Sequence, residues 1–194
     1  MIFQFLFSLL IIVILHETSH FIMAKLCNCD IEKVSIGFGK PLFSRKIGKT
    51  IYQICPIFLG GYVALRGELA YSRNKRAFTN LPYLNKLLIA VIGCLINIII
   101  GLLIISIGLY SNIYYLYFFG KISILLGLLN LLPIPPLDGS YPIFILIFEK
   151  LFGKKKGYSL LRKLNKFGFI IIMIINFICI PILVWQYYYL NMLK

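Results

Sequence analysis

Charged residues are scarce in this chain, and acidic residues are the scarcest of them. Only 13% of the 194 residues are Asp, Glu, Lys or Arg, whereas 60% are apolar. A water-soluble globule needs roughly a quarter of its residues charged to cover its surface. Because the apolar residues also fall in long runs, the composition excludes a soluble monomer and predicts a multi-pass protein embedded in a lipid bilayer.

The few charges are mostly of one sign. Twenty Lys and Arg oppose 6 Asp and Glu, which gives a net charge of +14. In a soluble protein this excess would suggest nucleic-acid binding, but no motif of a nucleic-acid-binding module accompanies it. The basic residues lie mainly between the apolar runs, as the positive-inside rule distributes them. We therefore expect them to face the cytoplasm and anionic headgroups, and we expect no nucleic-acid partner.

Cysteines are few and irregularly spaced. There are five, an odd number, and Cys27 and Cys29 leave one residue between them. A structural zinc knuckle has two residues at that place. The pattern favours reduced cysteines that fill apolar space over a disulfide or a second zinc site.

The apolar runs predict the spans. Residues 1–24 form a first transmembrane helix, followed by Lys25. Residues 87–120 carry no charge and are too long for one span of about 20 residues, so two helices are expected, near 87–109 and 113–132. Residues 167–190 form a last span. The short run 140–152 is either a re-entrant or an interfacial helix, and the sequence leaves both open.

The polar stretch 25–86 is interrupted by Gly and Pro and contains short β-prone pieces at 33–38, 50–54 and 62–65. We interpret it as a β-rich insert on the cytoplasmic side, where a basic loop at 150–166 also falls. The fold class expected is therefore an all-α polytopic membrane protein with about four transmembrane helices and a small β-rich insert. Residues 1–194 form one membrane-embedded domain.

Histidine is rare, and both histidines stand together. His16 and His20 are four residues apart with Glu17 between them, which is the pattern H-E-x-x-H. On a helix the two imidazoles share a face and can reach one zinc ion. The adjacent glutamate can take a proton from the attacking water. Merely structural polar side chains would be costly in lipid, so the pattern predicts a metal site.

A catalytic zinc typically has three protein ligands. Most other acidic residues lie in the polar insert or, like Glu149 beside Lys150, at an expected interface where a surface ion pair explains them. Asp138 alone follows a segment broken by three prolines next to a membrane helix. Irregular backbone at such depth is tolerated where it is buried in protein or lines a wet cavity. Elimination leaves Asp138 as the third ligand.

These two motifs carry a resemblance. H-E-x-x-H in the first helix, with Asn-x-x-Pro-x-x-x-x-Asp-Gly over 130–139, resembles the site-2 protease family of intramembrane zinc metalloproteases. The match is most like the branch that contains the stage IV sporulation protein FB. Residues 35–42, 60–63 and 93–97 are also similar to family motifs, although Cys94 stands where the family has proline. The resemblance covers roughly residues 8–142.

The resemblance implies roles for particular residues. His16, His20 and Asp138 would bind zinc, and Glu17 would be the general base. Asn130 would stabilise an oxyanion near the metal; the alternative is a helix cap. A strand edge would hold an unwound substrate, the alternative being an ordinary hairpin. The substrate-binding set that follows is Gly60, Gly61, Tyr62, Val63 and Asn97.

The function implied is cleavage of a peptide bond in or near a transmembrane segment of a membrane-associated protein, such as a transcription-factor precursor or a signalling protein. We expect a bacterial cell membrane, with the active site toward the cytoplasm. No region resembles a peptide-binding or nucleotide-sensing domain, so regulation is expected from a membrane partner or a homo-oligomer. Two alternatives stay open: an ion or metal transporter with broken helices, and a non-catalytic relative.

Overall fold

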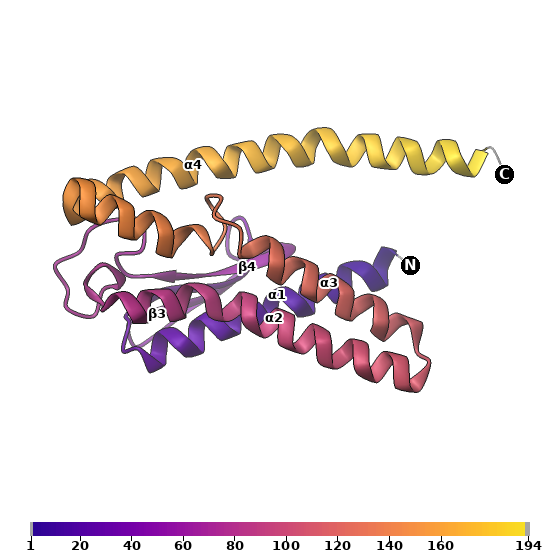
Figure 1. Cartoon of the computed structure of the whole chain (residues 1–194), viewed down its shortest axis with the longest axis horizontal. Coiled ribbons are helices and arrows are strands. Elements are labelled where there is room, and N and C mark those ends of the chain that lie inside the picture. The colour runs from indigo at the N-terminus through magenta and orange to yellow at the C-terminus, as the bar shows by residue number, and fades with distance from the viewer. Residues whose placement is uncertain (1, 193–194) are drawn as a thin grey trace.

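The computed structural model describes residues 2–192; the side chains of 2–6, 58–59, 172–173 and 175–192 are not described. The chain is mostly helical, with one small sheet inserted after the first helix (Figure 1). Its elements are α1 (Ile2–Leu26), β1 (Ile31–Phe38), β2 (Phe43–Ile47), β3 (Thr50–Ile54), β4 (Ile57–Leu65), the 3₁₀ turn η1 (Phe78–Asn80), α2 (Tyr83–Ser111), α3 (Tyr114–Asn130) and α4 (Ser140–Met192).

The sheet has the order β2-β3-β1-β4. Strand β1 is parallel to β3 and antiparallel to β4, and β2 forms a hairpin with β3. The order leaves β2 and β4 as the two edges, and β4 packs against α1. The three predicted β-prone pieces are strands. Strand β2 was not predicted because all five of its residues are exposed, so no buried face marks it in the sequence.

Within the described part of the chain, two helices are long and apolar enough to cross a membrane, over Phe7–Leu26 and Tyr83–Ser111. The predicted break near 110–115 is present: α2 ends at Ser111, and Asn112 adopts the left-handed conformation that ends helices. The shorter apolar helix α3 follows at Tyr114. The further spans expected from the sequence stay a prediction, and most side chains of 167–190 lie outside the described residues.

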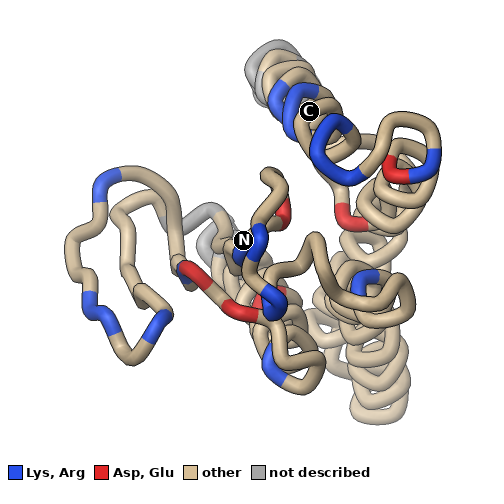
Figure 2. Tube along the Cα trace, turned by 90° about the vertical axis from the view of Figure 1, so that its left-hand side faces the viewer, with Lys and Arg blue, Asp and Glu red and all other residues tan. Residues whose placement is uncertain are grey.

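The basic stretch 150–166, predicted as a loop, is helical, and its place on the cytoplasmic side stays a prediction. Helix α4 is interrupted only at Gly153, where a φ of 71° breaks the helical conformation and the chain turns back along the molecule (Figure 1). Lys and Leu, which dominate this stretch, are good helix formers, and a basic composition does not by itself prevent a helix. Figure 2 shows Lys and Arg on the β2–β3 hairpin and on this middle part of α4.

A hydrophobic core lies where the sheet meets the helices. It joins the end of α1, β1, β4, η1, α2 and both parts of α4 through the following buried residues: Ala24, Cys29, Ile31, Leu65, Phe78, Ile89, Ile145, Tyr158 and Leu161. The cysteines Cys27, Cys29, Cys55 and Cys94 are free thiols, whereas Cys179 lies outside the described side chains. This core fixes the end of α1 relative to α2 and α4.

A buried ion pair ties α4 to the start of α2. Lys86 is 3% exposed, and its Nζ lies 2.6 Å from Oε1 of Glu149. The predicted surface pair of Glu149 with Lys150 is therefore wrong. Adjacent residues on a helix do not face each other, whereas α2 presents Lys86 directly to Glu149.

We predict that Glu149→Gln lowers the free energy of unfolding by about 3 kcal/mol, because it leaves the Lys86 ammonium buried without a counter-charge. The double variant Lys86→Met/Glu149→Met should lose less unfolding free energy than Glu149→Gln, because it leaves no buried charge without a partner. Denaturation of the protein in detergent measures both quantities. Glu32→Gln, at the exposed pair with Arg66, is the matched control and should cost under about 1 kcal/mol. Equal losses in the two glutamine variants would contradict the prediction.

Candidate metal centre

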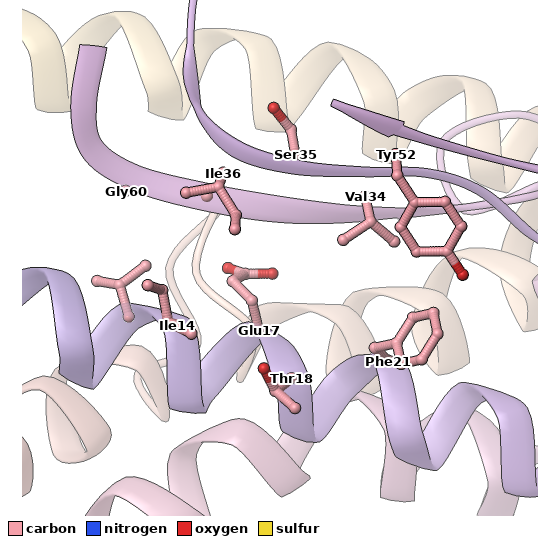
Figure 3. A pocket seen from close by; sticks show the side chains of 11 residues that line it. Ile14, Glu17, Thr18, Phe21, Val34, Ser35, Ile36, Tyr52 and Gly60 are labelled. Carbon is pink, nitrogen blue, oxygen red and sulfur yellow. The ribbon is translucent and has the colours of Figure 1, made fainter. Parts of the chain in front are cut away.

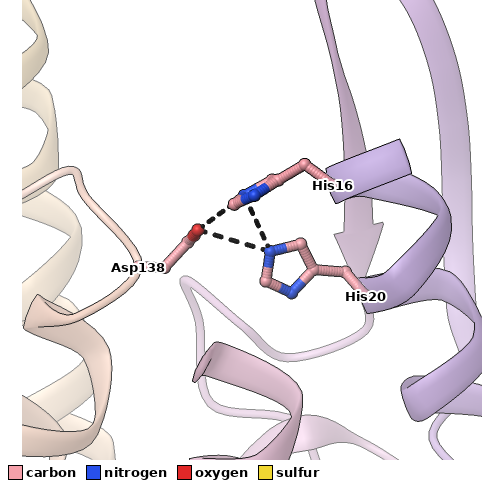
Figure 4. A group of neighbouring side chains, drawn as sticks. All are labelled: His16, His20 and Asp138. Carbon is pink, nitrogen blue, oxygen red and sulfur yellow. Dashed lines mark hydrogen bonds and ion pairs between the residues drawn. The ribbon is translucent and has the colours of Figure 1, made fainter. Parts of the chain in front are cut away.

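Three donor atoms from two distant parts of the chain converge at one point (Figure 4). Nε2 of His16 lies 2.9 Å from Oδ2 of Asp138 and 3.1 Å from Nε2 of His20. Nε2 of His20 lies 3.3 Å from the same carboxylate oxygen. The two imidazoles are buried on one face of α1, and Asp138 reaches them from the loop between α3 and α4.

The spacing of these atoms fits one tetrahedral metal ion. Ligands at 2.0–2.1 Å from a tetrahedral centre are about 3.3 Å apart. The three distances of 2.9, 3.1 and 3.3 Å are close to that value. Two imidazole nitrogens and one carboxylate oxygen are also donors that suit zinc. His16, His20 and Asp138 could therefore hold a metal ion.

Helix α2 orients both imidazoles. Nδ1 of His20 donates to the carbonyl oxygen of Ile89 at 2.6 Å, which makes Nε2 the nitrogen that can bind a metal ion once its own proton is lost. Nδ1 of His16 lies 3.2 Å from the side-chain amide of Asn97. The atom of Asn97 nearest to Nδ1 is the amide nitrogen Nδ2, whose N–H donates to Nδ1. A metal on Nε2 would place the proton on Nδ1, and the amide would then accept it through its oxygen once the group turns over. Asn97 thus contacts a metal ligand, whereas the sequence assigned it to the substrate.

The Asp138 loop is short and closed on itself. The prolines after Leu132 end α3, and the backbone N–H of Gly139 donates to the carbonyl oxygen of Asn130 at 2.8 Å. Helix α4 begins at Ser140, so Asp138 stands immediately before it. Burial alone would raise the pKa of the Asp138 carboxyl, but hydrogen bonds with both imidazoles hold that pKa well below its usual range. The carboxylate is therefore the ionised form that a metal ligand requires.

Glu17 lies between α1 and the edge of β4. A Cβ placed on Gly61 would be 3.6 Å from Cγ of Glu17, and the Val63 N–H donates to the Glu17 carboxylate. Glu17 also lines a cavity of about 190 Å³ together with His16, Asp138 and Asn130. The side chain of Glu17 is thus next to the metal site on one side and next to the open strand edge on the other.

The predicted site residues lie around the metal site, but they line different cavities. Asn130 is the last residue of α3, and its side chain lines the same cavity as the ligands. Gly60 and Gly61 line a cavity between α1 and the sheet, and Glu17 lines the same cavity (Figure 3). Tyr62 and Val63 line a separate cavity beside His20 and Asp138.

Sequence reasoning missed the role of Gly93 on α2. A Cβ at this position would lie 2.5 Å from Nε2 of His20 and 2.8 Å from Cε1 of His16. Only glycine leaves room for two imidazoles to stand against the helix. The pattern Gly93-x-x-x-Asn97 in an apolar helix was the available signal, because it places the gap and the amide one turn apart on the same face.

A His-His-Asp donor set, carried in part by a helix of membrane-spanning length, indicates a membrane protein with a metal site. The chain belongs to peptidase family M50, whose model matches residues 4–114 and 109–175. This agrees with the family that the two motifs indicated.

Individual relatives agree with this assignment. The chain is 39% identical over 103 residues to a protein of Neisseria meningitidis named "putative zinc metalloprotease", an alignment that covers 51% of this chain and 23% of that protein. Proteins given the same description in Borreliella burgdorferi (32% identical; 62% of this chain, 31% of that protein) and Clostridium perfringens (37%; 50% and 29%) also match. The matched segment is thus about a quarter to a third of each relative.

We predict that Gly93→Ala weakens zinc binding roughly tenfold to a hundredfold, because the new methyl group displaces the imidazoles from their shared position. Zinc bound per folded protein, measured by metal analysis after dialysis against a weak chelator, checks this. Gly101→Ala is the matched control. Gly101 also lies on α2, and its new methyl group would crowd α3 rather than the imidazoles. Normal zinc content in Gly93→Ala would contradict the prediction.

Proposed function

We propose that this protein is an intramembrane zinc endopeptidase that cleaves a peptide bond in or near a transmembrane segment of a membrane-associated protein. The convergence of His16, His20 and Asp138, with Glu17 alongside, carries the proposal. The names of the relatives, which describe zinc metalloproteases, support it.

His16, His20 and Asp138 would hold the zinc ion. A bound zinc ion supplies Lewis-acid polarisation of the scissile carbonyl and makes a water molecule nucleophilic near neutral pH. The Ile89 carbonyl holds the His20 imidazole with its proton on Nδ1, so that Nε2 faces the ion, and the Asn97 amide contacts Nδ1 of His16. The chain's other site residues bind the substrate and move the proton.

Glu17 acts as the general base. Its carboxylate shares a cavity with the ligands, so it can take a proton from the attacking water and pass it to the departing nitrogen. Asn130 also lines that cavity, and its amide N–H groups can donate to the oxygen on which negative charge develops.

The free edge of β4 binds the substrate as an added strand. A peptide bond within a helix is inaccessible, so the substrate must unwind before cleavage. Strand β4 is an edge of the sheet and lies against Glu17, so main-chain pairing there would bring an extended segment to the general base. Gly60 and Gly61 have no side chains, so the substrate backbone can approach β4 closely at these two residues.

The topology proposed has four spans, formed by α1, α2, α3 and the second part of α4, with the sheet and the kink of α4 toward the cytoplasm of a bacterial cell. Figure 1 supports it, since the sheet and the kink lie at one end of the helices and the α2–α3 turn at the other. A regulatory membrane protein or a second copy of the chain is the expected partner. A role in sporulation rests on the motif resemblance alone.

We predict that Glu17→Gln retains zinc but cleaves roughly 10²- to 10⁴-fold more slowly, because the amide cannot accept the proton. The assay uses the full chain in detergent, loaded with zinc, and a mixture of extended apolar peptides whose products are identified by mass spectrometry. Cleavage by the wild type and none by the variant, at equal zinc content, is the expected result. A transporter or a non-catalytic relative would cleave nothing in either form.

The strand edge has its own test. Gly61→Ala places a methyl group 2.7 Å from the Ser35 carbonyl oxygen, so β4 must shift, whereas Gly60→Ala meets only the ring of Phe38. We predict that Gly61→Ala lowers kcat/KM about tenfold to a hundredfold through substrate misplacement, with normal zinc content. Gly60→Ala should lose less. Parallel losses of zinc and activity in Gly61→Ala would instead indicate a folding defect and contradict strand addition.

A further inference from the structure

Two of the six acidic residues have no ion-pair partner in the described part of the chain. Asp138 contacts the imidazoles, and the following acids pair with Lys or Arg: Asp30, Glu32 and Glu149. The exceptions are Glu17 and Glu68. This is unusual in a chain with 20 basic and 6 acidic residues, and both exceptions line the same cavity beside the metal site.

Glu68 follows the end of β4, and its hydrogen-bond donors among the described residues are neutral. Its Oε2 accepts from the backbone N–H of Leu65 at 3.1 Å, and the Tyr141 hydroxyl also binds it. That hydroxyl in turn accepts from Nδ2 of Asn165 at 2.9 Å. These contacts fix the position of the carboxylate but do not neutralise it. Burial accordingly raises the pKa of Glu68 to about 7.

Two cavities of different character lie beside Glu17. The first, of about 140 Å³, is largely apolar and is bounded by α1 and the sheet through Val13, Ile14, Phe21 and Ile36 (Figure 3). The second, of about 130 Å³, contains the carboxyl groups of three acids: Glu17, Glu68 and Asp138. A divalent cation on two neutral imidazoles balances two of these negative charges, so one remains when all three are ionised.

Strand β4 runs from the first cavity to the second. Gly60 and Gly61 line the apolar cavity, and Tyr62, Val63 and Leu65 line the acidic one. An extended segment paired with the free edge of β4 would therefore pass both cavities. At about 3.3 Å per residue, the stretch from Gly61 to Leu65 corresponds to roughly four substrate residues.

We propose that Glu68 is a specificity-determining residue that receives a Lys or Arg side chain of the substrate within about four residues of the cleaved bond. This inference rests on the proposed function, since it concerns the segment held along β4. The apolar stem of a long basic side chain can pack along the lining of the cavity while its charged end reaches the Glu68 carboxylate. The cationic group supplies the missing counter-charge and forms a charge-assisted hydrogen bond with the carboxylate.

The test measures which peptides the zinc-loaded full chain cleaves, as the Glu17→Gln experiment does. The probe is a library of extended apolar peptides with Lys, Met or Glu placed in turn at each position around a common cleaved bond. At one offset, the wild type should cleave the Lys peptide roughly 10- to 100-fold better than the Met peptide, the discrimination expected for one charged hydrogen bond.

Variants assign the preference to its residue. Glu68→Gln should reduce the ratio of Lys to Met cleavage to near one, and Glu68→Lys should reverse it in favour of the Glu peptide. A loss of folding would not produce that reversal. Glu32→Gln, which removes an acid outside the cavity, is the matched control and should leave the ratio unchanged.

The outcomes separate the two proposals. A wild type that cleaves neutral peptides but shows no basic preference at any offset overturns the role of Glu68 and leaves the peptidase function intact; this result needs no variant. A basic preference that survives in Glu68→Gln also overturns it. A zinc-loaded wild type that cleaves no peptide overturns the peptidase function, and the role of Glu68 with it.

Discussion

The contact of α1 with the loop after α3 is the constraint on which the site depends. Two imidazoles and one carboxylate meet there, with their donor atoms 2.9 to 3.3 Å apart. Each partner is positioned by other parts of the fold. The prolines and the Gly139–Asn130 hydrogen bond position Asp138. The hydrophobic core at the end of α1 fixes the position of α1 relative to α2 and α4. The geometry of the metal site therefore depends on the packing of several parts of the molecule.

Helix α2 connects these requirements. It provides the Ile89 carbonyl and the Asn97 amide that orient the imidazoles, and the gap at Gly93 that admits them. Its first turn also carries Lys86, which is paired with α4. One helix thus supplies the surroundings of two ligands and anchors the element that follows the third. Because buried polar groups without partners are costly, such pairing of the ligands is expected of a functional cluster.

Local patterns in the sequence were enough to predict much of this site. The pattern H-E-x-x-H places two ligands and a carboxylate on one helix because the helical repeat is fixed, and the proline-broken segment singled out Asp138. The sheet order and the partner of Glu149 required contacts between distant residues, which one sequence does not reveal. Glu68 lies in the polar insert, and its local sequence does not mark it, yet the fold directs its side chain inward, against Tyr141 on α4.

The ligands also divide the chain in an uneven way: His16 and Asp138 are 122 positions apart. A metal ion shared between them acts as a cross-link that closes a very long loop. Because such closure restricts the unfolded chain, the free energy of metal binding becomes part of the free energy of folding. Chelation would then loosen the association between the amino-terminal helix and everything beyond the prolines, so that a single ion serves the chemistry and also fastens the two halves of the molecule.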